Sequence, residues 1–429
     1  MAVIFAEGGP HRVITAEVKR HAVRAALRHA GDSSRVLVLP PDGSRPHADA
    51  GTITQMLYEE AGAPAAFHVM PALGTHRPMG AEDLRAIFGP LIPPAAFKEH
   101  RWREHLTALG AVPSEYVHQV SGGVLRGLMP DYEIPVEVNR ALLEGAYTAV
   151  FSVGQVVPHE VAGMANGFKN VLIGIGGQQT INRSHFLGAV YGMERMMGRA
   201  DTPVRAVLNY AHVHYLAQLG IVYIMTVVAQ QTDGRMAVRG IYVGDEEAAF
   251  LLAADLSRQV NVTVLDEPQQ RTVVYLEPGE FTSTWLGNKA IYRTRMAVAD
   301  GGELTVIAPG VRTFGEDSRV DRLIRRYGYR GTPATLEAAR QDPELRDNLS
   351  AAAHLIHGSS EGRFRIVYAT SPSLMSRREV EAAGFEWRDV SDVLRQYPPR
   401  KLREGANDGF YYVSCPAMGL WATRDRFAL

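Results

Sequence analysis

The chain has 429 residues, of which 46% are apolar and 21% are charged, and its formal net charge is −1. This length favours two domains, and the composition is that of an ordinary soluble globular protein. The balanced charge argues against a nucleic-acid-binding surface and against a polybasic membrane surface. The single cysteine, Cys415, excludes an intramolecular disulfide and a thiolate-rich zinc site.

Two features of the sequence predict a cytoplasmic location. Residues 1–7 lack the basic start and the longer apolar core of a signal peptide. The longest apolar run, at 221–229, is too short to span a bilayer. We therefore expect a cytoplasmic protein that binds neither nucleic acid nor membrane.

Runs typical of strands alternate with helical patterns along the whole chain, which predicts an α/β fold with mainly parallel sheets. The Asp-Gly signal in residues 232–235 predicts a hairpin between two strands. In chain order, the elements expected before residue 260 are helix 16–30, strand 35–40, a helix starting near Asp49, strand 65–70, helix 81–88, strands 148–153, 171–174, 221–228 and 236–243, and helix 246–257.

A polar stretch with a proline, at 265–271, is the best linker candidate. We therefore predict an N-terminal α/β cofactor-binding catalytic domain over residues 1–267 and a C-terminal α/β domain over residues 268–429. The active site is expected in the cleft between these two lobes. The elements expected after the linker are strand 272–276, helix 289–298, strand 304–308, helices between 320 and 356, and strands 364–369 and 410–414.

Titratable side chains recur just after the predicted strands. Asp42, Ser44 and Arg45 follow strand 35–40, and His76 and Arg77 follow strand 65–70. Ligands of open α/β sheets bind outside the carboxyl ends of parallel strands, so these side chains are expected to share one crevice. Each also has a simpler interpretation as a surface charge or a locally bonded side chain, and Ser44 could cap the helix that starts near Asp49.

The segment 158–170 is the most informative part of the chain. It follows strand 148–153 and begins with His159, continues through a loop with Gly163 and Gly167, and ends at Lys169. Such a loop brings backbone close to a flat ligand, with an imidazole and an amine at its two ends. A buried lysine amine can hold a cofactor covalently, and imidazole suits both acid–base chemistry near neutrality and nickel binding.

Taken together and in this order, the motifs resemble those of the nickel-dependent lactate racemases and related hydroxyacid racemases and epimerases. The matching patterns are the D-x-S-R-P turn at 42–46, the G-x-H-R-P turn at 74–78, the H-x-x-A-G-x-x-x-G-x-K loop at 159–169, the histidine His185, and Lys289 ahead of Gly301–Gly302.

This resemblance implies a cofactor, a nickel-pincer nucleotide, joined to the amine of Lys169 through a thioamide. His185 would be the protein ligand of the nickel. Cofactor-biosynthesis proteins would then be partners. The resemblance also implies that the cofactor is bound with the help of Asp42, Ser44, Gly163 and Gly167.

The implied reaction inverts the secondary-alcohol carbon of a 2-hydroxyacid by reversible hydride transfer. The substrate oxygen then occupies two positions, so two bases are needed, one for each enantiomer. The resemblance assigns these roles to His76 and His159. The anionic substrate would be held by Arg45, Arg77, Trp285 and Lys289, since a guanidinium fork matches a carboxylate.

Three departures from the family pattern bear on the substrate. Leu286 stands where lactate racemases carry a polar amide that helps bind substrate, and Trp285 stands at their neighbouring tyrosine. The loop reads Ala165–Asn166–Gly167–Phe168 in place of a serine–glycine–glycine–arginine run. These changes predict a larger or polyhydroxylated acid rather than lactate.

Two other classes of function remain as alternatives. His212 and His214, on one face of a strand with another histidine, would suit a metal-dependent hydrolase or lyase; a non-catalytic nickel or nucleotide carrier would need no pair of bases. His354 and His357 lie one helical turn apart, which favours a shared packed face. The run 174–177 is half of a dinucleotide fingerprint without its full spacing, so a conventional NAD site is not expected.

Overall fold

The computed structural model describes residues 3–231 and 233–428. The α/β class with mainly parallel sheets is confirmed. The chain divides into two compact units, one formed by Met1–Leu187 and Gly198–Asn261 and the other by Gly188–Met197 and Val262–Leu429. The second unit therefore also takes in a short segment from the first half of the chain, which the sequence did not indicate. The cleft between two lobes stays a prediction.

The first unit is built on a mixed six-stranded sheet. Its strand order is β1-β10-β9-β6-β2-β3, in which β9, β6, β2 and β3 are parallel neighbours and β10 and β1 are added antiparallel. The strands are β1 (Val3–Gly8), β2 (Arg35–Leu39), β3 (Ala66–Val69), β6 (Ala149–Gln155), β9 (Val222–Gln230) and β10 (Met236–Gly244).

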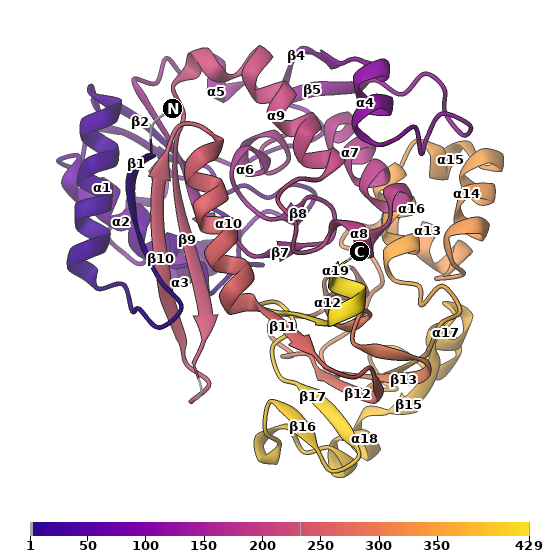
Figure 1. Cartoon of the computed structure of the whole chain (residues 1–429). Helices are drawn as coiled ribbons and strands as arrows, with labels where there is room; N and C mark the ends of the chain where they lie inside the picture. The colour runs from indigo at the N-terminus through magenta and orange to yellow at the C-terminus, as the bar shows by residue number, and fades with distance from the viewer. Residues whose placement is uncertain (1–2, 232, 429) are drawn as a thin grey trace. The chain divides into compact units, whose positions relative to one another are not determined.

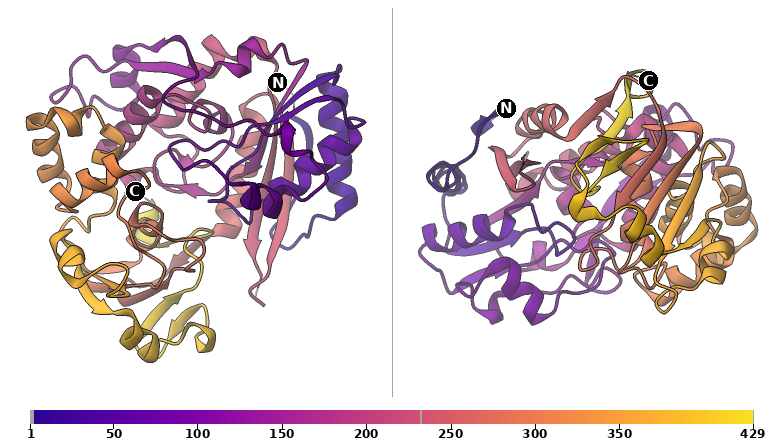
Figure 2. Two further views of the ribbon diagram at one scale, coloured as in Figure 1. Left: turned by 180° about the vertical axis from the view of Figure 1, so that it is seen from behind. Right: turned by 90° about the horizontal axis from the view of Figure 1, so that it is seen from below.

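Helices cover both faces of this sheet. Figure 1 shows α1 (Ala16–Ala30) and α2 (Ala50–Glu60) on one side and α10 (Glu247–Asn261) on the other. The predicted hairpin is confirmed as the long antiparallel pair β9–β10, seen from behind in Figure 2, although Thr232 of its turn lies outside the described residues. The unit's remaining elements are α3 (Ala81–Phe88), β4 (Leu106–Val112), α4 (Ser114–Val120), β5 (Ile134–Asn139), α5 (Ala141–Glu144), β7 (Pro158–His159), β8 (Gly163–Met164), α6 (Phe168–Leu172), the start of α7 (Gln178–Tyr191) and α9 (Pro203–Tyr215).

The second unit has its own six-stranded sheet, in the order β15-β14-β13-β12-β17-β16, parallel except for the edge strand β16. Its strands are β12 (Gln269–Tyr275), β13 (Val298–Ala308), β14 (Arg365–Thr370), β15 (Glu386–Asp389), β16 (Gly405–Asn407) and β17 (Phe410–Val413), and β11 (Val262–Leu265) pairs separately with β18 (Leu420–Thr423). The helices are α8 (Met193–Met196), α11 (Thr284–Gly287), α12 (Lys289–Thr294), α13 (Ser318–Tyr327), α14 (Thr332–Gln341), α15 (Pro343–Arg346), α16 (Leu349–His357), α17 (Arg377–Ala382), α18 (Val390–Gln396) and α19 (Arg424–Ala428).

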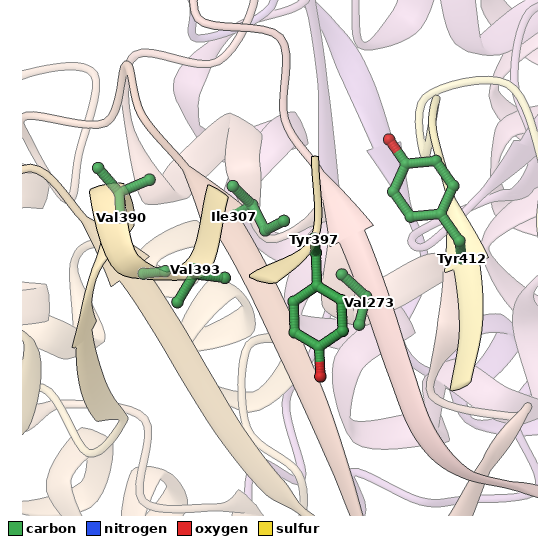
Figure 3. Packing of buried hydrophobic residues seen from close by; sticks show 7 residues of the cluster. Val273, Ile307, Val390, Val393, Tyr397 and Tyr412 are labelled. Atoms are coloured by element: carbon green, nitrogen blue, oxygen red, sulfur yellow. The ribbon is translucent and has the colours of Figure 1, made fainter. Parts of the chain in front are cut away.

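An apolar cluster fills one face of this second sheet. Val390 and Val393 of α18 pack with Tyr397 onto Val273 of β12 and Ile307 of β13, as Figure 3 shows. These side chains are between 0 and 7% exposed. Burial of large apolar groups on a parallel sheet is what holds such a layer in place.

Two segments are helical where a strand was predicted at 171–174 and offered at 212–214 only within the alternative metal site. Residues 171–174 form the end of α6 and the turn after it, and His212 and His214 lie on α9. A run of four apolar residues does not distinguish a buried strand from a buried helix, which explains the first error. In α9, Thr202 accepts a hydrogen bond from Arg205 N and Pro203 occupies the first turn, a strong helix start that overrides the β-branched residues. Among the described residues, no helix has the length and apolarity needed to cross a bilayer.

Candidate active site at the strand ends of the first unit

Three neighbouring parallel strands bring the predicted residues to one edge of the first sheet. Asp42 follows β2, His76 follows β3 and His159 follows β6, and β2 pairs with both of the others. Beyond the strands, Pro41 and Ala72 form a further parallel bridge, with Ala72 N donating to Pro40 O at 2.7 Å. The two turns that carry Asp42 and His76 are therefore held side by side.

Asp42 joins the two turns directly. Its Oδ2 lies 2.6 Å from His76 Nδ1, and its Oδ1 accepts the hydroxyl of Ser44 at 2.6 Å. Burial alone would raise the pKa of the Asp42 carboxyl, but the charge and hydrogen bond of His76 and the hydrogen bonds of Ser44 lower it below its ordinary value. Since the ionised carboxylate only accepts, His76 donates from Nδ1, and the lone pair of its neutral ring lies on Nε2. Ser44 therefore supports Asp42, and the alternative that it caps α2 is wrong because Asp49 occupies the N-cap position there.

His159 has the opposite arrangement of its ring nitrogens. It is 6% exposed, and its Nδ1 accepts the backbone N–H of Val161 at 3.1 Å. The neutral ring therefore carries its proton on Nε2, which lies 3.8 Å from Glu160 Oε1. At this site His76 is prepared to accept a proton and His159 to donate a hydrogen bond.

The glycine loop brings the chain back toward the strand ends. Gly163 has φ 76° and Gly167 has φ 61°, left-handed conformations that favour glycine. A Cβ on Gly167 would also lie 3.0 Å from the ring of Phe250. The loop ends sooner than the sequence indicated, because Lys169 already lies in the short helix α6.

Asn170 fixes that helix to the sheet. Its amide nitrogen donates to Leu39 O at the end of β2, at 2.8 Å, and to Ser152 Oγ of β6, at 3.0 Å. Gly74 N, in the turn that carries His76, donates to Gly174 O at 2.8 Å. Lys169 is thus placed by bonds on both sides to the turns that hold Asp42 and His76.

The amine of Lys169 has an unusual environment. Burial, helped by the positive charges of Arg45 and Arg205 and opposed by Glu160 and Asp42, lowers its pKa to about 7. These charges place Arg45, Glu160 and Asp42 within electrostatic reach of the amine. Near neutral pH a large share of Lys169 is the uncharged, nucleophilic form.

Arg205 is a functional candidate that sequence reasoning missed. It is 2% exposed, donates to Asn166 O at 3.0 Å and to Met164 O at 2.5 Å, and stacks over Phe250 at 4.1 Å. The guanidinium therefore holds two backbone carbonyls of the glycine loop in place. The available signal was one charged residue among the apolar positions of a helix, at 204, 207, 208 and 211.

His185 lies on α7, whose start is tied to β5. Glu137 of β5 accepts Gln179 N at 3.1 Å, and Thr180 Oγ1 donates to Pro135 O at 2.7 Å. Within the helix, His185 Nδ1 lies 2.8 Å from Ile181 O, so Nδ1 donates and the lone pair of the neutral ring lies on Nε2. This is the form in which a histidine ligates a metal.

The remaining predicted residues are placed as follows. Arg45 is half-buried in the turn after β2, and Arg77 is exposed beside His76. Trp285 on α11 and Lys289 at the start of α12 are half-buried and belong to the second unit, so their substrate-binding roles stay predictions. Lys289 Nζ lies over the ring of Phe281 at 5.5 Å.

The alternative metal site finds no support in the described residues. His212 is buried and stacks on Phe168 at 3.7 Å, whereas His214 is exposed and stacks on Tyr210. Residues two apart on a helix do not face one another. Across 3–231 and 233–428, no three His, Cys, Asp or Glu side chains gather as a metal site.

The low pKa of Lys169 predicts its reactivity. An amine-directed acylating reagent should modify Lys169 with a pH midpoint near 7, well below the ordinary lysine pKa of 10.5. Because the folded state binds fewer protons than the unfolded state between these values, the stability contribution of this group rises with pH across that window. Peptide mapping at several pH values measures the midpoint, with the exposed Lys401 as internal comparison. A midpoint near 10 for Lys169 would contradict the assignment.

Comparisons with known proteins bear on the family and the fold of this chain. Residues 129–197 match the family model described as the lactate racemase N-terminal domain. No curated protein matches the chain. A crystal structure of a protein from Thermotoga maritima, a structural-genomics target, is 24% identical with a TM-score of 0.83 and covers 97% of this chain and 100% of its own.

A second solved structure is the lactate racemase apoprotein from Thermoanaerobacterium thermosaccharolyticum. It is 16% identical with a TM-score of 0.67, covering 95% of this chain and 93% of its own, which shows a shared fold. The matched residues 129–197 contain the glycine loop and the start of α7. The family model therefore confirms the resemblance of this chain to the lactate racemase family, through the segment that contains His159, Lys169 and His185.

Proposed function

We propose that the protein is a racemase or epimerase that inverts the alcohol carbon of a 2-hydroxyacid with a nickel-pincer nucleotide held on Lys169. The observation that carries the proposal is the amine of Lys169, on the half-buried first turn of α6 directly after the glycine loop, with its pKa lowered to about 7. The segments after β3 and β6 at the same sheet edge carry two histidines in opposite hydrogen-bonding states. A non-catalytic carrier would need no such pair.

The residues present suit this cofactor. A nucleophilic amine at Lys169 suits covalent attachment, and the left-handed backbone at Gly163 and Gly167 sets the course of the loop that leads to it. His185 offers one imidazole nitrogen, and a pincer that supplies the other donors needs only one protein ligand. When bound, the cofactor supplies the acceptor for the substrate hydride. The proteins that build it would be partners of this chain.

The protein's own part in the reaction is to move the proton on the substrate oxygen. His76 Nε2 takes the hydroxyl proton, and Asp42 stabilises the resulting imidazolium through Nδ1. For the other enantiomer the oxygen is served by His159. There the charged His159, which has given up the bond from Val161 N–H and is stabilised by the carboxylate of Glu160, returns a proton from Nε2 to the substrate oxygen and becomes neutral, balancing the proton taken by His76.

The expected substrate preference rests on Leu286 and Trp285. A polar substrate group that loses its partner at Leu286 costs about 1–3 kcal/mol, or roughly ten- to a hundredfold in specificity. We therefore expect kcat/KM for lactate to lie below that for longer or hydroxyl-rich 2-hydroxyacids such as sugar acids. Steady-state assays of the loaded enzyme on a panel of 2-hydroxyacids measure this order.

Two variants sharpen the substrate test. Leu286→Gln restores the amide and should raise lactate turnover relative to larger acids, whereas Leu374→Gln, at an exposed leucine of the same unit, should leave the order unchanged. Lactate outperforming every larger acid would refute the specificity proposal. Rapid exchange of the carbon-bound hydrogen with solvent deuterium would refute hydride transfer.

A further inference from the structure

A buried chain of hydrogen bonds in the second unit ends beneath Trp285. The ring of His354 lies against Trp285, with ring centroids 4.4 Å apart and planes at 30°. His354 is 5% exposed, on a helix whose residues are all buried, whereas Trp285 is half-buried. The backbone of Trp285 is held separately, since its N–H donates to Phe314 O at 2.9 Å.

The direction of each hydrogen bond in this series follows from Thr284, which lies at one end of it. Thr284 Oγ1 donates to Phe314 O at 3.0 Å, so toward Tyr329, 2.8 Å away, it can only accept. The hydroxyl of Tyr329 donates its proton to Thr284 Oγ1 in that hydrogen bond, and it therefore accepts a hydrogen bond from His354 Nε2, at 2.9 Å. In the neutral ring Nδ1 then accepts a hydrogen bond from the hydroxyl of Tyr292, at 2.6 Å.

These bonds fix the ring plane of His354 as well as its tautomer. Two bonds to opposite ring nitrogens prevent rotation about the side-chain axis, and Tyr329 is itself stacked on Phe385 with centroids 4.7 Å apart. Thr284, Tyr292 and Tyr329 are at most 5% exposed, so water does not compete for these bonds. A histidine that served only to fill space would need none of this.

We propose that His354 is a positioning residue that fixes the indole plane of Trp285 and thereby sets which 2-hydroxyacids the protein prefers. The inference rests on the proposed function for its consequence in specificity, but the positioning itself concerns the unliganded protein. A flat aromatic face held at one angle favours substrates whose carbon chain is long enough to lie along it. Lactate is too short to use such a surface.

The first experiment measures positioning without any substrate. The chain has four tryptophans, so protein labelled with 5-fluorotryptophan gives four fluorine resonances, and Trp285→Phe assigns one of them. We expect His354→Gln to shift or broaden the Trp285 resonance and leave the other three unchanged. An unchanged Trp285 resonance in His354→Gln would overturn the proposal.

A second variant separates positioning from stability. Combining His354→Phe, Tyr292→Phe and Tyr329→Phe keeps the aromatic rings and removes the hydrogen-bonding groups of all three side chains together, while Thr284 keeps its bond to Phe314 O. The Trp285 resonance should broaden in a protein that still unfolds cooperatively. Tyr397→Phe, which alters a buried tyrosine of the α18 cluster, is the matched control and should change neither measurement.

The third measurement connects positioning to specificity. In the loaded enzyme, His354→Gln should lower kcat/KM for the preferred long acid relative to lactate by about two- to tenfold, through KM. An altered Trp285 resonance with an unchanged specificity ratio overturns the role in specificity. Loaded wild-type enzyme that turns over no 2-hydroxyacid overturns the proposed function instead, and the fluorine spectra still decide the positioning.

Discussion

Replacing Lys169 by arginine should abolish covalent cofactor attachment. Protein co-produced with the cofactor-building enzymes should carry the added mass on the peptide that contains Lys169, and Lys169→Arg should have the unmodified mass. Arginine keeps the positive charge and most of the length, but its guanidinium stays protonated and is not a nucleophile. Activity should fall on the order of a thousandfold or more, as expected when a group essential to the chemistry is removed.

Two controls make this result specific. Lys289→Arg changes a lysine of the second unit and should keep the full adduct, since the attachment depends on the amine of Lys169, whose pKa is lowered to about 7. Arg205→Met should keep Lys169 but reduce loading, because the carbonyls of Met164 and Asn166 lose their donors. An adduct found on another residue, with Lys169 unmodified, would contradict the assignment.

The parts of the site that the sequence predicts are those governed by strand order. Asp42 and His76 lie 34 residues apart but follow neighbouring parallel strands, so their contact at 2.6 Å could be expected from the position of each motif after its strand. The helix α6 was harder to predict, because its glycine punctuation indicated a loop while the packing of Asn170 on β2 and β6 stabilises a turn of helix.

The parts that could not be predicted depend on packing between distant segments. Arg205 supports the glycine loop only because α9 lies against α6, and a single sequence does not show that proximity. His354 is similar, since its spacing to His357 indicated a packed helix face and gave no sign of Trp285 or of the two tyrosines. Tertiary contacts decide both roles, while local patterns indicate only that these residues are buried.

Three histidines of the first unit, His76, His159 and His185, should separate into two classes when metal is measured. His185→Ala should lose nickel from the loaded protein, because its Nε2 is the proposed protein ligand and alanine offers no donor. His76→Gln and His159→Gln should keep nickel at the wild-type ratio while activity falls by about a hundred- to ten-thousandfold, the range for loss of a general acid or base. Elemental analysis of the purified variants, paired with their intact masses, makes the measurement.

The hydrogen bonds around each ring explain why the classes should differ. His185 Nδ1 is hydrogen-bonded to Ile181 O, which puts the lone pair of the neutral ring on Nε2, whereas His76 Nδ1 is hydrogen-bonded to the Asp42 carboxylate, which favours a ring that becomes charged. A cation beside a metal is unfavourable, so a ring prepared for protonation is poorly suited as a ligand. Asp42→Asn tests this directly, because it should reduce activity with nickel retained and shift the acid limb of the pH–rate profile. Loss of nickel in all three histidine variants, with folding intact by circular dichroism, would show that the division between ligand and base is wrong.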